Sequence, residues 1–298
     1  MDILCPQCQS VLRQQPGRWR CDNNHCFDTA KQGYTNLLLV QNKRSRAPGD
    51  DAVMVESRTR FLNAGLYQPI ADALNQQLLS QLTNNDSALS IIDAGCGEGY
   101  YTERLQQAMR DRQQPCDIVG IDISKFAVRA AARRSKACRW FVANSSRLPV
   151  ADGSADIVLS LFSPLPSKEF ARVCTPQGLL FVASTGPQHL IEMREQLYDK
   201  VDQQSLEPAN QLQSHFQRVS QHSLTQHIDL TCAQQIEDLL SMTPHYWRAS
   251  PARKQQLCQQ PSMTVTLDIQ LHCFKKVAST KTTPGTYEGS CEGTCEDA

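Results

Sequence analysis

The sequence has no net charge and no long hydrophobic run. Its 298 residues include 30 Lys and Arg and 30 Asp and Glu, so the formal net charge is zero. No window of about 18 apolar residues occurs, and the segment Met1–Cys5 has no basic stretch followed by an apolar one. We therefore expect a soluble, cytoplasmic protein with no membrane partner. A nucleic-acid partner would need a local basic surface, because the whole molecule has no field of either sign.

Thirteen cysteines are present, and in the cytoplasm we expect them to be reduced. Two residues separate Cys5 from Cys8, three separate Cys21 from His25, and twelve separate the two pairs. This spacing is typical of a structural zinc site with four protein ligands. Cys26 is an alternative to His25, since neighbouring side chains of an extended backbone point to opposite faces and only one can reach the metal.

The residues between the two ligand pairs predict a hairpin. Pro16 and Gly17 supply the turn, and the residues on either side supply two short strands. A domain this small needs its metal to fold. We therefore expect a small zinc-binding domain at residues 1–36.

Residues 90–99 carry the most specific motif, an apolar strand that breaks into a glycine-rich turn before a helix. The turn contains Gly95, Gly97 and Gly99 in a G-x-G-x-G pattern after Asp93. Glycine allows positive φ and close approach of the backbone to a ligand. Asp122 follows a second apolar run and would present its carboxylate to a ribose diol.

The glycine pattern differs from a dinucleotide fingerprint. That fingerprint needs a third glycine at the position of Tyr100, and Glu98 would put negative charge where a diphosphate lies. S-adenosylmethionine (SAM) has no phosphate and carries a sulfonium and an amino group, so an acidic loop suits it. The motif favours SAM, with Asn144 placed after the third strand to contact the adenine.

The remaining pattern alternates strands and helices and predicts a mostly parallel α/β sheet, a Rossmann-like class I SAM-dependent methyltransferase domain. Helices are expected at 52–64, 68–82, 101–110 and 125–136, and strands at 140–143, 156–162 and 178–184. The domains expected are the zinc domain at 1–36, a basic loop with connecting helices at 37–84, the methyltransferase domain at 85–275, and a disordered tail at 276–298.

Several motifs together resemble the RlmA-type 23S ribosomal RNA guanine-N1 methyltransferases. Individually only the zinc ligands and the glycine loop are generic, whereas the combination is specific. The matching segments are the N-terminal finger, residues 43–50, residues 95–102, residues 185–190 and residues 242–249.

The resemblance implies a fold, a reaction and a set of partners. The reaction is methylation of N1 of one guanine in the helix 35 hairpin of 23S rRNA, presented as rRNA or within a ribosomal particle, with SAM as donor. The resemblance also implies an RNA-recognition role for the zinc domain and a homodimer whose subunits form an RNA cleft. The implied ligands are Cys5, Cys8, Cys21 and His25 for zinc, and Tyr67, Gly99, Tyr100 and His189 for SAM.

Two roles near the reaction stay open at this point. His189 is a weak candidate for the proton acceptor, with a SAM contact as the alternative. Trp247 and Arg248 are candidates to hold a flipped base, with core packing the favoured role for Trp247. Two alternative functions also remain open for the whole protein. It could be a small-molecule SAM-dependent methyltransferase or a non-catalytic, zinc-dependent RNA-binding protein.

Overall fold

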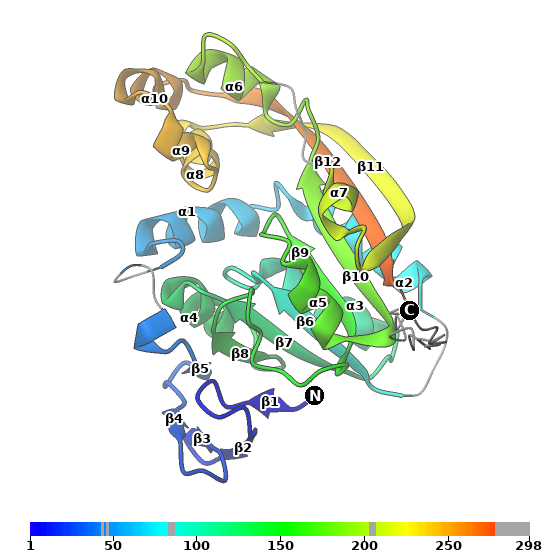
Figure 1. The fold of residues 1–298 in the computed structure, drawn as a ribbon. Helices are drawn as coiled ribbons and strands as arrows, with labels where there is room; N and C mark the ends of the chain where they lie inside the picture. Colours follow the sequence, from blue (N-terminus) through cyan, green and yellow to red (C-terminus); the bar gives the residue numbers. More distant parts are fainter. Residues whose placement is uncertain (43–44, 46–47, 83–86, 203–206, 278–298) are drawn as a thin grey trace, which may run out of the picture.

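The computed structural model describes residues 1–42, 45, 48–82, 87–202 and 207–277. Their strands form a four-stranded sheet at the N-terminus and an eight-stranded sheet covered by helices. The small sheet lies at one end of the molecule (Figure 1), and helices α6, α8, α9 and α10 gather at the other end. Among the described residues, no helix is long and apolar enough to span a bilayer.

The small N-terminal sheet is antiparallel throughout, with the strand order β1-β2-β3-β4. Its turn at Gly17 has φ of 74°, which glycine adopts without strain. This confirms the predicted hairpin. The strands are β1 (Ile3–Leu4), β2 (Val11–Gln15), β3 (Arg18–Arg20) and β4 (Cys26–Asp28).

The large sheet has the strand order β11-β12-β10-β9-β6-β7-β8-β5. Six neighbouring strands, from β10 to β5, run parallel, as the alternating pattern predicted. Strand β12 runs antiparallel to its neighbour β10, and β11 runs antiparallel to β12. The bounds are β5 (Tyr34–Asn36), β6 (Leu89–Ala94), β7 (Cys116–Asp122), β8 (Arg139–Val142), β9 (Ala155–Leu161), β10 (Cys174–Thr185), β11 (Phe216–Leu230) and β12 (Met263–Lys276).

The sequence did not predict the hairpin of β11 and β12. No tight turn joins these strands, because α8, α9 and α10 are inserted between them, so the usual sequence signal of a hairpin is absent. The expected tail from 276 to 298 begins at the last residue of β12, and residues 278–298 lie outside the described part, as do 43–44 and 46–47 of the basic loop.

The four helices expected from the sequence occur within a few residues at each end, and the described helices after residue 166 were not predicted. Ile70, Leu74 and Leu78 form the buried stripe of α2, and Asp51 and Ser124 cap α1 and α4. The helices are α1 (Ala52–Asn63), α2 (Gln68–Ser80), α3 (Tyr100–Asp111), α4 (Lys125–Arg134), α5 (Ser167–Val173), α6 (Ile191–Leu197), α7 (Pro208–Leu212), α8 (Ala233–Ser241), α9 (His245–Arg248) and α10 (Pro251–Cys258), with a 3-10 turn η1 at Val40–Asn42.

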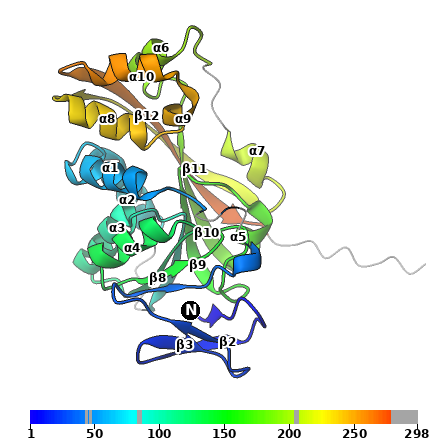
Figure 2. The same ribbon diagram turned by 90° about the vertical axis from the view of Figure 1, so that its left-hand side faces the viewer.

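The small sheet is packed directly against the large one (Figure 2). The Trp19 ring meets the Phe141 ring edge-on at 5.4 Å, and the backbone N–H of Leu4 donates to the carbonyl of Pro149 at 2.8 Å. Strand β5 lies within the range 1–36 expected for the zinc domain, yet it pairs with β8 as the edge strand of the large sheet. A strand of three residues gives no sequence signal of which sheet it joins.

Candidate functional site: a metal cluster and a cavity at the sheet edge

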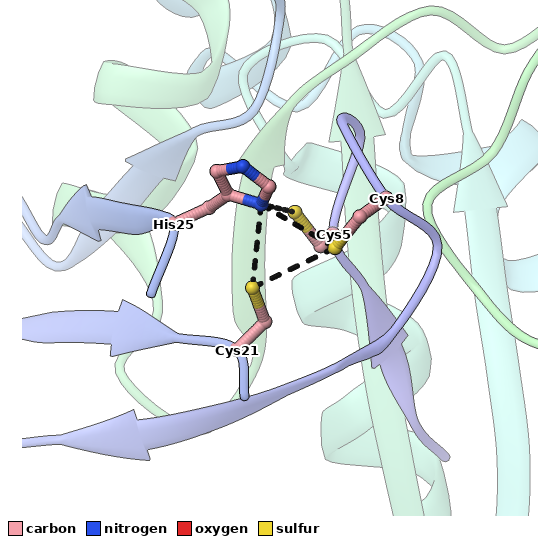
Figure 3. A group of neighbouring side chains, drawn as sticks. All are labelled: Cys5, Cys8, Cys21 and His25. Carbon is pink, nitrogen blue, oxygen red and sulfur yellow. Dashed lines mark hydrogen bonds between the residues drawn. The ribbon is translucent and has the colours of Figure 1, made fainter. Parts of the chain in front are cut away.

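Cys5, Cys8, Cys21 and His25 converge in the small sheet, with all four donor atoms within 4.8 Å of one another (Figure 3). The Sγ atoms of Cys8 and Cys21 are 3.7 Å apart, and Nδ1 of His25 lies 3.3 to 3.5 Å from the three sulfur atoms. Cys26 lies in β4 and is exposed. The cluster therefore includes His25 and leaves Cys26 out.

These distances fit a zinc ion. Tetrahedral Zn–S bonds of about 2.3 Å and Zn–N bonds of about 2.0 Å place neighbouring ligand atoms roughly 3.5 to 3.8 Å apart. Burial raises the pKa of Cys5 to about 11, whereas hydrogen bonds from Ser10 and Asn23 lower the pKa of Cys8 to about 5. Metal binding favours the thiolate at both positions. Four protein ligands leave no open position, so zinc at this site is structural.

A cavity of about 1170 Å³ lies at the carboxyl ends of the parallel strands. This is the edge where open α/β sheets bind ligands. Segments that follow β6, β7, β8, β9 and β10 line it from the sheet side, and residues of α1, α6, α9 and the 242–244 segment between α8 and α9 line it from the other side. The cavity contains seven of the nine residues predicted to contact SAM: Tyr67, Asp93, Gly95, Gly97, Asp122, Asn144 and His189.

The glycine turn and Asp122 are joined by hydrogen bonds. Oδ2 of Asp122 accepts from the backbone N–H of Gly97 at 3.0 Å, and Oδ1 accepts from the N–H of Ser124 at 2.7 Å. Burial raises the pKa of Asp122, and these two bonds act in the opposite direction. Asn144 follows β8, and its Oδ1 accepts from the N–H of Ser146 at 2.9 Å, which leaves the amide NH₂ as the donor.

Asp93 is a buried carboxylate with one oxygen unused. Its Oδ2 accepts from the hydroxyl of Thr102 at 2.6 Å, and Oδ1 has no hydrogen-bond partner among the described residues. Burial raises the pKa of Asp93 to about 7. Because an unpaired buried oxygen is costly, this atom is suited to a cationic or donor group of a ligand.

Arg58 reaches the cavity from α1 and was not predicted as a site residue. Its guanidinium forms an ion pair with Asp50, and the carboxylates of Asp50, Glu98 and Asp122 raise its pKa against the effect of burial. Arg58 offsets part of the negative charge of the glycine turn, including Glu98, which is 2% exposed. No local motif marks Arg58, because it meets these carboxylates only in the folded chain.

Gly99 and Tyr100, which the resemblance implies contact SAM, lie at the start of α3 and are not among the residues that line the cavity. Gly99 is the N-cap of α3, with φ of 81°, and a Cβ on it would lie 2.9 Å from Ala131 and from Trp140. Tyr100 is 4% exposed, with the guanidinium of Arg104 over its ring at 5.3 Å. Both residues pack α3 against its neighbours.

Tyr67 and His189 both line the cavity. Tyr67 is the N-cap of α2 and packs edge-on against Phe61 at 5.1 Å. Nδ1 of His189 accepts from the backbone N–H of Asp268 at 3.4 Å, so the ring proton is assigned to Nε2. Burial lowers the pKa of His189 to about 4, so the ring is neutral at physiological pH.

Trp247 is exposed to 65% and lines the cavity beside Arg248. The core-packing role expected for Trp247 is therefore wrong. Helix α9 has four residues and no buried ones, so it places this indole at the surface.

Two family models match the chain. One, described as RlmA, N-terminal, covers residues 3–46, and the other, described as methyltransferase domain, covers residues 91–178. Together with the sheet topology and the cavity, they define a SAM-dependent methyltransferase that carries a zinc ribbon.

Relatives cover nearly the whole chain. A protein of Micromonospora griseorubida is 31% identical over 92% of this chain and 97% of its own length. A protein of Bacillus subtilis is 30% identical over 90% of this chain and 94% of its own length. Both are provisionally named 23S rRNA (guanine-N(1)-)-methyltransferase. The 23S rRNA (guanine(748)-N(1))-methyltransferase of Streptomyces fradiae is 30% identical over 84% of this chain and 87% of its own length. The chain belongs to this family of 23S rRNA (guanine-N1) methyltransferases.

Proposed function

We propose that this protein transfers the methyl group of SAM to N1 of a guanine in the helix 35 hairpin of 23S rRNA. The observation that carries the proposal is the extent of the likeness, which spans the zinc ribbon and the methyltransferase domain of relatives named for guanine-N1 methylation. A small-molecule enzyme would share the SAM domain and have no need of the ribbon. A non-catalytic RNA-binding protein would have no need of the cavity.

We assign the part of the cavity next to β6, β7 and β8 to SAM. The unpaired Oδ1 of Asp93 accepts from the amino group of SAM, and Asp122 accepts from the ribose hydroxyls. Gly95 and Gly97 let the backbone approach the ligand, and the amide of Asn144 donates to the adenine. The volume of about 1170 Å³ exceeds the roughly 300–1000 Å³ usual for one small ligand, which leaves room for a base.

The second part of the cavity is assigned to the guanine. Phe162 and Trp247 present exposed rings to it, 42% and 65% exposed, and a base that leaves its helix can stack on such rings. Phe162 has φ of 54°, a left-handed conformation that an aromatic residue rarely adopts. Strain of this kind is common at functional sites, which supports the assignment.

When bound, SAM supplies an activated methyl group on a positively charged sulfur. The protein has to hold guanine N1 in line with that methyl group, about 3 to 3.5 Å away. Methylation at N1 also requires the N1 proton to pass to a base or to solvent water, and the negative charge that develops on O6 would be stabilised by hydrogen-bond donors. His189 has its proton on Nε2 and its Nδ1 occupied, so we assign it as a hydrogen-bond donor to the bound reactants and not as the proton acceptor.

The proposed reaction is tested by mapping the product. The purified protein is incubated with SAM and either unmodified 23S rRNA or ribosomal particles, and N1-methylguanine is located by reverse-transcription arrest. A SAM-dependent stop in helix 35 supports the proposal, and a stop elsewhere or none on either substrate overturns it. Analytical ultracentrifugation of the same sample tests the homodimer that the resemblance implies.

A further inference from the structure

Helix α4 carries a row of basic side chains on its exposed face. Lys125, Arg129 and Arg133 are four residues apart and all exposed, so they lie along one side of the helix. Lys136 follows just beyond the helix end and is also exposed. The segment 123–138 contains no Asp or Glu. We call Lys125, Arg129, Arg133 and Lys136 the α4 basic stripe.

The first three cations of this stripe have no partner within the described part of the chain. Lys125, Arg129 and Arg133 form no ion pair and no side-chain hydrogen bond there, in contrast to Arg134, which turns inward to Glu103. A row of unpaired like charges is unfavourable for the isolated protein. Since the chain has zero net charge, the stripe concentrates positive potential at one place on the surface.

An aromatic ring lies within the stripe. Phe126 is 40% exposed, although it is a large apolar side chain, and it lies three and seven residues before Arg129 and Arg133 on the same helix side. Cations that contact phosphates and an aromatic ring that stacks on a base are the two elements of single-stranded nucleic-acid binding.

The stripe connects the cavity with the zinc ribbon. At its start, the Ser124 hydroxyl donates to the carbonyl of Asp50 at 2.6 Å, beside the ion pair of Asp50 with Arg58 at the cavity. At its end, Lys136 donates to the carbonyl of Gln32, in the segment that leaves the ribbon. Figures 1 and 2 show α4 between the ribbon and α1. The ten residues of the helix span about 15 Å, at a rise of about 1.5 Å per residue.

We propose that the α4 basic stripe binds the phosphate backbone of the substrate RNA between the zinc ribbon and the cavity, and that Phe126 stacks on an unpaired base there. The inference rests on the proposed function, because it names the surface along which that RNA lies. Docking along α4 fixes the RNA at both ends of the stripe and so directs one nucleotide toward the cavity.

The test compares two double variants that remove the same charge. Arg129→Gln/Arg133→Gln removes the centre of the stripe. Arg110→Gln/Lys275→Gln removes two exposed cations at the amino end of the parallel strands, the edge opposite the cavity. Affinity for a 23S rRNA transcript is measured at several salt concentrations, with SAM affinity, thermal unfolding and the single-turnover rate at saturating RNA as further readouts.

For the stripe variant we expect RNA affinity to fall at least tenfold at 0.15 M salt. The slope of log affinity against log salt should shrink by about 1.5, since each lost phosphate contact contributes roughly 0.7 to 0.9. SAM affinity, unfolding temperature and the rate at saturating RNA should match the wild type. Phe126→Leu should lower RNA affinity several-fold and leave the salt slope unchanged.

Equal RNA affinity and equal salt slope for the stripe and control variants would overturn this inference. The outcome is separable from the proposed function, because methylation of 23S rRNA by the wild type and by the control variant establishes that function whatever the stripe does. Binding without methylation by the wild type would overturn the proposed function and still test the stripe through the salt slope.

Discussion

The carboxylate of Asp122 accepts a hydrogen bond from the backbone N–H of Gly97 at 3.0 Å. The two residues follow neighbouring parallel strands, β6 and β7, and meet at their carboxyl ends. This bond sets the glycine turn and the carboxylate that we assign to the ribose in one fixed arrangement. Any change to Asp122 therefore acts on both.

Asp122→Asn should lower SAM affinity about 10- to 100-fold. Hydrogen bonds to a charged group are worth roughly 1.5–3 kcal/mol each, and an amide cannot accept from both Gly97 and Ser124. Isothermal titration calorimetry measures the change. Asp111→Asn, at the exposed end of α3, is the control and should bind SAM like the wild type. If Asp122→Asn binds SAM with wild-type affinity, Asp122 is not part of the SAM site.

SAM affinity should rise with pH up to about pH 7 and then level off. The pKa of Asp93 is raised by burial to about 7, and its ionised form is the one that binds an ammonium group. Below that pKa each pH unit should cost about tenfold in affinity. Titrations between pH 5.5 and 8.5 measure this, and Asp93→Asn should give weak, pH-independent binding. A pH-independent wild type would contradict the assignment of Asp93.

The raised pKa of Asp93 also affects the stability of the ligand-free fold. Because the folded-state pKa of Asp93 lies above its ordinary value of 3.8, the native state holds the proton more tightly than the unfolded chain. The contribution of Asp93 to the free energy of unfolding therefore decreases as pH rises from about 4 to about 7 and is constant above. In urea unfolding, the free energies of the wild type and Asp93→Asn should differ in their pH dependence within this window, with a constant difference above pH 7.

Gly99→Ala should destabilise the fold while SAM affinity stays within about twofold. A Cβ at Gly99 would lie 2.9 Å from Ala131 and Trp140, which overpacks the contact between α3 and its neighbours. Gly17→Ala is the matched control, since Gly17 also has positive φ and a Cβ there would have no atom within 4 Å. In urea unfolding, the free energy of unfolding of Gly99→Ala should be about 1–3 kcal/mol lower than that of the control. Loss of SAM binding at unchanged stability would instead place Gly99 in the SAM site.

Cys8→Ser should lose zinc and, with it, methylation of rRNA. Removal of one of four ligands weakens a site whose binding free energy holds the small sheet together. Because the ribbon packs on the large sheet through Trp19 and Phe141, the unfolding temperature should also fall. Metal analysis of the purified protein measures the zinc. Cys26→Ser, at the exposed cysteine beside His25, should retain one zinc per chain, and its loss there would contradict the ligand set.

Local sequence signals predicted much of the fold because they depend on nearby residues. The spacing of Cys5 and Cys8 places two thiolates on one turn, and the repeat of Ile70, Leu74 and Leu78 defines a helix face. The alternation of strands and helices predicted the parallel sheet. The antiparallel strands β11 and β12 were not predicted, since their pairing spans three inserted helices.

The sequence by itself determined the metal-ligand spacing, the glycine turn and the carboxylates Asp93 and Asp122, since each is encoded by residues that act within one short segment. The tertiary structure decided that His25 and not Cys26 completes the cluster, that Arg58 enters the cavity, and that Gly99 and Tyr100 pack α3 against its neighbours. These outcomes depend on which side chains meet across distant segments. Packing and burial in the folded chain decide which distant side chains meet, and the local spacing of residues encodes neither.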